Sequence, residues 1–132
     1  MKKIALSIGV LGSLWAAALS TAPAYAQNER SWVSNTGSGA ACTETAPCAT
    51  FEAALAVTAN NGEIDCLTPG DYGTGTTLAI GISVTINCGA FVGGITAPSG
   101  SPAITVNGSG ILVVLKSLVL NGNGVGTDGI DI

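Results

Sequence analysis

The sequence predicts an all-β fold, a parallel β-solenoid of about three coils with an N-terminal capping helix. Short runs of alternating apolar residues follow one another after Gly62, and each run is followed by glycine-rich punctuation. Two look-alike runs, GEIDC and VTINC, also end in a cysteine. A β-sandwich explains the strands equally well, but it makes the matched cysteine positions a coincidence.

Residues 1–26 have the order of a secretory signal peptide. Lys2 and Lys3 precede a largely apolar run from Ile4 to Leu19, and small residues then lead to Ala24-Tyr25-Ala26. Glycine and serine interrupt the run, which is shorter than a membrane span requires. We therefore expect export to the periplasm or the extracellular space, cleavage after Ala26, and no membrane span in the mature chain.

The mature chain, 27–132, is acidic. It keeps Arg30 and Lys116 against eight acidic residues, a formal charge of −6. Nucleic acids and anionic membrane surfaces are bound through clusters of Lys and Arg, and two isolated cations do not form one. The expected partner is a polysaccharide or a cell-surface component, and nucleic acid is not expected.

Residues 27–49 are interpreted as an irregular lead-in that contains a disulfide loop. An even number of cysteines in an exported chain usually means disulfides, and the four cysteines are Cys42, Cys48, Cys66 and Cys88. Three pairings are open to four cysteines, and the sequence alone does not choose among them. In the lead-in, Cys42 and Cys48 are interpreted as the ends of a small loop.

Residues 50–62 are predicted to form the capping helix. Thr50 is a suitable N-cap and Gly62 a suitable stop. The apolar face of this helix, at helical spacing, consists of Phe51, Ala54, Leu55 and Ala59.

Residues 63–132 are predicted to form the coils. Cys66 and Cys88 lie 22 residues apart, a plausible length for one coil. Neighbouring strands lie about 4.8 Å apart, within the Cα separation of about 4.4–6.8 Å that a disulfide accepts. Stacked coils would therefore allow a Cys66–Cys88 bridge. A second alignment, of 80–87 on 114–121, has an offset of 34 and indicates an irregular repeat.

The stretch TFEAALAVTANNGEIDCLTPGDYG resembles the N-terminal signature of pectate-lyase-like right-handed parallel β-helix proteins, in particular exported bacterial members. The matching residues are Ala54, Leu55, Ala59, Gly62, Ile64, Pro69, Gly70 and Tyr72. The resemblance implies a right-handed winding and, in the lyases of the family, a Ca²⁺ site with a basic residue that abstracts a proton. Arg30, which is expected to precede the coils, and Lys116 are the basic candidates.

The chain contains no histidine, which excludes Ser-His-Asp and Cys-His catalysis and leaves no imidazole ligand for a transition metal. We therefore expect a structural or surface-interaction role without catalysis in this chain. The alternative is a fragment of a carbohydrate-active protein, similar to a polysaccharide lyase or a glycoside hydrolase, with Asp65, Asp71 and Tyr72 as carbohydrate contacts. Asp65 and Asp71 flank one turn and could be neighbours, although solvated outward-facing acids are commoner.

No cofactor is expected, with calcium as the one alternative. The stretch NGVGTDGID at 123–131 nearly matches the calcium-binding nonapeptide, with Asp128 and Asp131 as ligands. Such sites form between adjacent repeats and only one copy is present, so an ordinary glycine-rich turn is the other interpretation.

The chain ends in the strand-like GIDI without a cap. We therefore expect the N-terminal portion of a longer β-helix protein, or a natural truncation of one, whose exposed last edge could self-associate. Asn87, Asn107 and Asn121 each close a strand, either as an internal asparagine stack or as ordinary turn residues.

Overall fold

The computed structural model describes residues 27–132, and the predicted signal peptide at 1–26 lies outside the described residues. In the described part, one helix and ten strands follow one another. None of its helices is long and apolar enough to cross a membrane.

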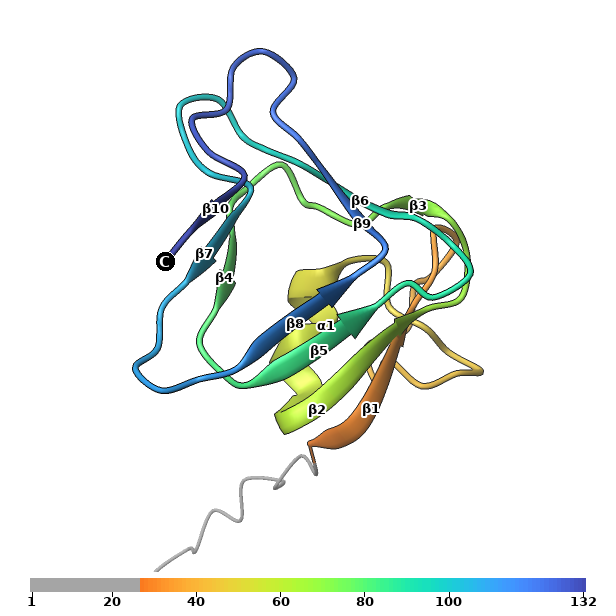
Figure 1. Cartoon of the computed structure of the whole chain (residues 1–132). Helices are drawn as coiled ribbons and strands as arrows, with labels where there is room; N and C mark the ends of the chain where they lie inside the picture. Colours follow the sequence, from red (N-terminus) through yellow and green to blue (C-terminus); the bar gives the residue numbers. More distant parts are fainter. Residues whose placement is uncertain (1–26) are drawn as a thin grey trace, which may run out of the picture.

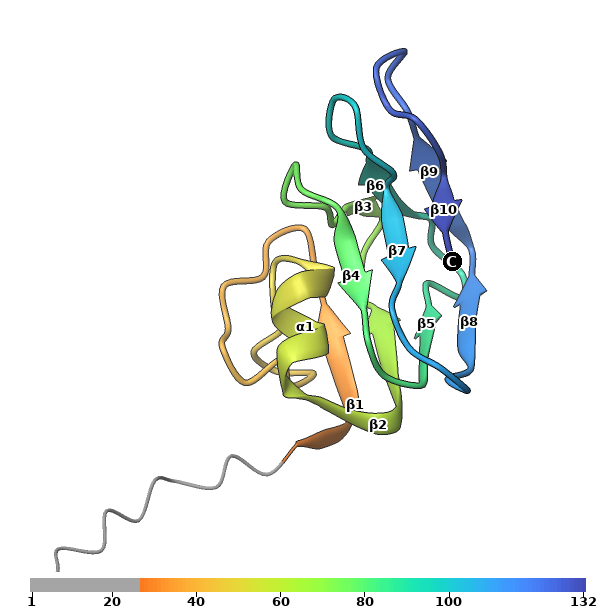
Figure 2. The same cartoon turned by 90° about the vertical axis from the view of Figure 1, so that its left-hand side faces the viewer.

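The strands form three parallel sheets that wind into a right-handed solenoid (Figures 1 and 2). The first sheet contains β1 (Asn28–Val33), β2 (Thr58–Cys66), β5 (Val84–Asn87) and β8 (Val113–Lys116). The second contains β3 (Gly70–Asp71), β6 (Gly93–Thr96) and β9 (Leu118–Asn121). The third contains β4 (Leu78–Ile80), β7 (Ile104–Val106) and β10 (Ile130–Asp131). The predicted parallel β-helix is thus confirmed.

The first sheet has four rungs rather than the three or so expected, because β1 adds one ahead of β2. The interpretation of 27–49 as irregular is therefore wrong at its start. Arg30, expected to precede the coils, lies on the first rung and pairs with Glu63. Only Ser31 and Val33 point inward from this strand, both fully buried, so the apolar alternation in the sequence is too short to reveal it.

The helix α1 (Phe51–Val57) is shorter than the predicted 50–62. Thr50 is its N-cap, as expected, and accepts a hydrogen bond from the Ala53 N–H at 3.2 Å. The helix ends early because Thr58 already has an extended backbone and begins β2. A helix of two turns is marginal by itself, and the strand pairing of β2 prevails. Ala59 consequently lies on the strand and not on the helix.

The helix covers the N-terminal end of the stack, as predicted for a cap (Figure 2). Phe51 and Ala54 are fully buried, and Leu55 packs against the core from a half-buried position. The ring of Phe51 lies 5.0 Å from that of Tyr72, which is also fully buried. The two rings therefore close the core of the first coil.

Neighbouring coils are in register but differ in length. Glu63 pairs with Thr85, 22 residues later, whereas Val84 pairs with Val113, 29 residues later. The alignment of 80–87 on 114–121 is wrong, because Leu118–Asn121 lies in the second sheet. The extra residues of the later coil are taken up by the loops on either side of β7 (Figure 1).

Asn87 and Asn121 are turn residues and do not form a common stack. They lie in different sheets. The side-chain oxygen of Asn87 accepts the N–H of Gly89 at 3.0 Å, and that of Asn121 accepts the N–H of Asn123 at 2.9 Å. These bonds are the Asx turns that favour asparagine at the end of a strand.

Candidate functional site: the outer face of the first sheet

All four cysteines are paired, Cys42 with Cys48 and Cys66 with Cys88. The Cα atoms of Cys66 and Cys88 lie 4.5 Å apart, since Asp65 and Asn87, the residues before them, are paired on adjacent rungs. The bridge therefore joins two successive coils, as the stacking hypothesis required. Two disulfides fit a protein that resides outside the reducing cytoplasm.

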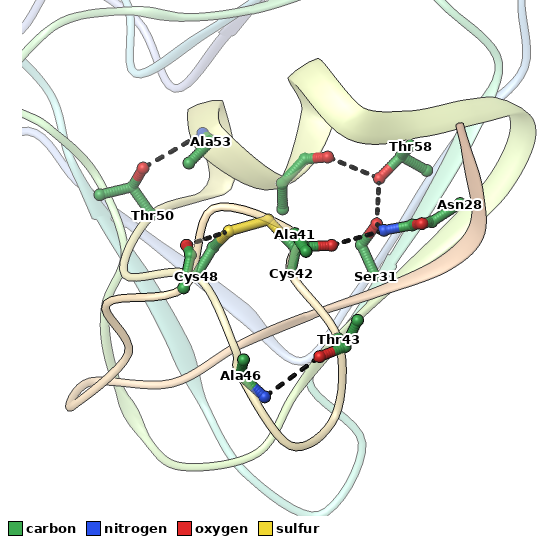
Figure 3. Close-up of a disulfide and its surroundings, with 12 residues drawn as sticks. Asn28, Ser31, Ala41, Cys42, Thr43, Ala46, Cys48, Thr50, Ala53 and Thr58 are labelled. Atoms are coloured by element: carbon green, nitrogen blue, oxygen red, sulfur yellow. Dashed lines mark hydrogen bonds between the residues drawn. A yellow bond between two sulfur atoms is a disulfide. The ribbon is translucent and has the colours of Figure 1, made fainter. Parts of the chain in front are cut away.

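The Cys42–Cys48 loop covers the free edge of β1 (Figure 3). The N–H of Trp32 donates to the Cys42 carbonyl at 2.8 Å, and the N–H of Cys48 donates to the Trp32 carbonyl at 2.9 Å. Asn28 adds a side-chain hydrogen bond to the Ala41 carbonyl at 2.7 Å. An uncovered edge strand would be a template for pairing with another chain, so this loop protects one side of the first sheet.

The outer face of the first sheet carries a group of polar side chains around one tryptophan. Inward and outward residues alternate along each strand, and the fully buried Ile64 and Ile86 identify the inward side. The register places two outward rows across the four strands, Arg30–Glu63–Thr85–Val114 and Trp32–Asp65–Asn87–Lys116. We call these eight residues the outer face.

Arg30 holds both carboxylates of the outer face. Its Nη2 lies 2.9 Å from Glu63 Oε2, and its Nε lies 2.9 Å from Asp65 Oδ2. The second oxygen of Glu63 accepts a hydrogen bond from Asn87 Nδ2 at 3.0 Å. The side chains are progressively less exposed from Arg30 (53%) to Glu63 (28%) and Asp65 (19%). The side chains of this cluster therefore link β1, β2 and β5 in addition to the backbone pairing of these strands.

The two carboxylates have pKa values displaced in opposite directions. The hydrogen bonds from Arg30 and Asn87 lower the pKa of Glu63, because they favour its charged form. Burial, and then the nearby charge of Glu63, raise the pKa of Asp65 and outweigh the attraction to Arg30. The same contacts raise the pKa of Arg30, chiefly through its hydrogen bond to Glu63.

This arrangement is better suited to binding than to hydrolysis. Two features resemble a catalytic pair. Glu63 and Asp65 are two residues apart on one strand, so their Cα atoms lie about 6.6 Å apart. Their pKa values are displaced in opposite directions, which is typical of acid–base pairs. However, Arg30 forms ion pairs with both carboxylates. The guanidinium therefore occupies one oxygen of each carboxylate, whereas a catalytic pair must be free to face the substrate.

The carbohydrate contacts predicted at the first turn do not come together. Asp71 lies in the second sheet, where its carboxylate accepts hydrogen bonds from the Gly73 N–H at 2.9 Å and from Thr96 Oγ1 at 2.5 Å. Tyr72 is fully buried and its hydroxyl bonds to Thr68, so the expectation that Tyr72 contacts a ligand is wrong. Of the three predicted contacts, only Asp65 belongs to the outer face.

The calcium site predicted at Asp128 and Asp131 stays a prediction. Asp128 lies in the loop before β10 and Asp131 on that strand. Within residues 27–132, no group of three or more acidic, cysteine or histidine side chains is placed to hold a metal ion.

Sequence reasoning missed the residues that define the outer face, namely Trp32, Glu63 and Asn87, and it placed Arg30 ahead of the coils. One signal was present: Ser31-Trp-Val33 repeats the inward–outward alternation of Ile64-Asp-Cys66, and the two segments are paired in the structure. Polar inward Ser31 concealed this match.

Comparisons with protein-family models, with curated proteins and with solved structures found no match to this chain.

Proposed function

We propose that this chain is an exported, disulfide-stapled β-solenoid module that acts by binding a surface component rather than by catalysis. Two disulfides and the leader-like sequence at 1–26 support export to an oxidising compartment. The resemblance of residues 50–73 to pectate-lyase-like β-helix proteins supports a carbohydrate as the partner.

The outer face carries this proposal. It combines one half-buried tryptophan with the paired charges of Arg30, Glu63 and Asp65, and with the exposed Lys116 at its far side. An aromatic ring provides apolar contact area, and polar side chains of the same face, Asp65 on the neighbouring strand and Thr85 on the next, provide hydrogen-bonding groups, which is the usual composition of a ligand site. The formal charge of −6 on 27–132 opposes a strongly acidic partner, so a neutral polysaccharide is favoured.

The test is binding of the secreted protein to insoluble cellulose, xylan and peptidoglycan, measured by depletion from solution. Trp32→Ala is expected to reduce binding up to about tenfold, since an aromatic contact of up to about 1.5 kcal/mol corresponds to that factor. Phe91→Ala is the matched control, because Phe91 is an exposed aromatic (40%) outside the outer face. Urea titration establishes that the wild type and Trp32→Ala are both folded. Equal binding by the two folded proteins would refute this role.

A second candidate is a fragment of a carbohydrate-active β-helix protein, supported by the opposed pKa displacements of Glu63 and Asp65. Incubation with neutral and acidic polysaccharides, with and without Ca²⁺, would then release reducing ends or unsaturated products. Asp65→Asn would abolish the activity, and Asp71→Asn, which alters a carboxylate on another sheet, would leave it intact. A complete lack of turnover rejects this candidate and leaves the binding role.

A further inference from the structure

Four asparagines in the described chain are followed by glycine: Asn61, Asn107, Asn121 and Asn123. In such a pair the glycine nitrogen attacks the side-chain amide carbon of asparagine, and the missing Cβ of glycine leaves the approach open. The new N–C bond closes a succinimide and ammonia leaves, after which water opens the ring to aspartate or isoaspartate. Because all four pairs have the same chemistry, their relative rates in the folded protein depend on local structure.

Two of the pairs lie in exposed loops. Asn107 follows β7, and Asn123 lies between β9 and β10. All four asparagines are exposed. Gly108 and Gly124 lie outside the strands. Within 27–132 neither the Asn107 nor the Asn123 side chain makes a hydrogen bond, although the Asn107 N–H donates to the Ile80 carbonyl at 2.8 Å. Their amide groups are therefore free to rotate toward the following nitrogen.

The other two pairs are held by the sheets. Asn61 lies within β2, where its N–H donates to the Ser83 carbonyl at 2.7 Å, and the buried Gly62 is paired with Val84. Asn121 ends β9; its side-chain oxygen accepts the N–H of Asn123 at 2.9 Å, and its carbonyl accepts the N–H of Ala97 at 2.8 Å. Ring closure at either residue requires these contacts to open first.

The structure assigns Asn107 and Asn123 as deamidation sites of the folded protein, whereas Asn61 and Asn121 are protected. Each conversion adds one negative charge to a loop between successive strands of an already acidic chain. The aspartate product changes only the charge, whereas the isoaspartate product also lengthens the backbone by one carbon within the loop.

Peptide mapping by mass spectrometry, after incubation of the disulfide-intact secreted protein at mildly alkaline pH, tests this assignment. The two loop asparagines are expected to convert about tenfold faster than the two strand asparagines, a factor that corresponds to about 1.4 kcal/mol of local opening. Conversion of Asn61 or Asn121 at the rate of the loop pairs would overturn it.

Two controls separate structure from sequence. In the reduced, urea-unfolded chain the four rates are expected to converge, and persistence of the folded-state order there would also overturn the assignment. Asn107→Gln should abolish the fast conversion at 107, because closing the larger ring is slower, and should leave the conversion of Asn123 unchanged. Loss of both signals in this variant would count against independent loop sites.

Discussion

The two disulfides should stabilise the fold unequally, because they close loops of different length. Cys66 and Cys88 are 22 residues apart and Cys42 and Cys48 are 6 apart. In the chain-entropy treatment, restriction of the unfolded chain then contributes about 3.4 kcal/mol for the longer loop and about 2.2 kcal/mol for the shorter one. The difference of about 1.2 kcal/mol is a large fraction of a typical stability.

The assay compares two double variants, Cys66→Ala/Cys88→Ala and Cys42→Ala/Cys48→Ala. Each removes two buried sulfurs and leaves no free thiol, so the loss of apolar contact is similar and the comparison isolates loop length. The free energy of unfolding is measured by urea titration under non-reducing conditions. An equal or greater loss in the Cys42/Cys48 variant would refute the reasoning from loop closure.

Two further predictions concern packing and pH. Gly93→Ala should lower the free energy of unfolding by about 1–3 kcal/mol, because the new methyl group would collide with the Cys88 sulfur. Gly94→Ala is the control, since the nearest atom to its added methyl group lies at 3.4 Å. Equal losses of stability in the two variants, measured by urea titration, would contradict the predicted collision. For Glu63, a lowered pKa means stabilisation that is complete above the unfolded-state pKa and is lost as pH falls through the folded-state value. The free energy of unfolding of the wild type should therefore exceed that of Glu63→Gln at about pH 6 but not at about pH 3. A difference in stability between the two proteins that persists at the lower pH would exclude the ion pair with Arg30 as its source.

The repeat of the coils was predictable because it depends on local patterns. Alternation around Ile64 and Ile86 marks the inward side of two strands, and the matched cysteines at their ends indicate the register that the two strands adopt. These signals are strong because a one-residue slip would turn the apolar residues outward. The N-cap at Thr50 was predictable because it also depends on a local pattern: its side chain accepts a hydrogen bond from the first turn of its own helix.

The outer face was not predictable, because its contacts are long-range. Arg30 reaches Glu63 and Asp65 across 33 and 35 positions of sequence, and the chain between them contains a helix and a disulfide loop that interrupt the strand pattern. Thr58 shows the same effect at the end of the helix. Its hydroxyl bonds to the Ala54 carbonyl at 2.6 Å and to Ser31 at 2.8 Å, a partner on another strand, so helical spacing alone overestimates where the helix ends.

The pairing of each strand only with its neighbours above and below has a consequence for how the molecule acquires its shape. The first winding must bring together Arg30 and Glu63, and the next joins Glu63 to Thr85, which is nearer along the chain. The entropy lost on closing a loop grows with the length of the intervening chain. Forming the first coil is therefore less favourable than adding the next, which pairs with a strand that is already in place. Synthesis from the N-terminus presents the segments in that same order, and the growing end is the only place where a new turn has to dock.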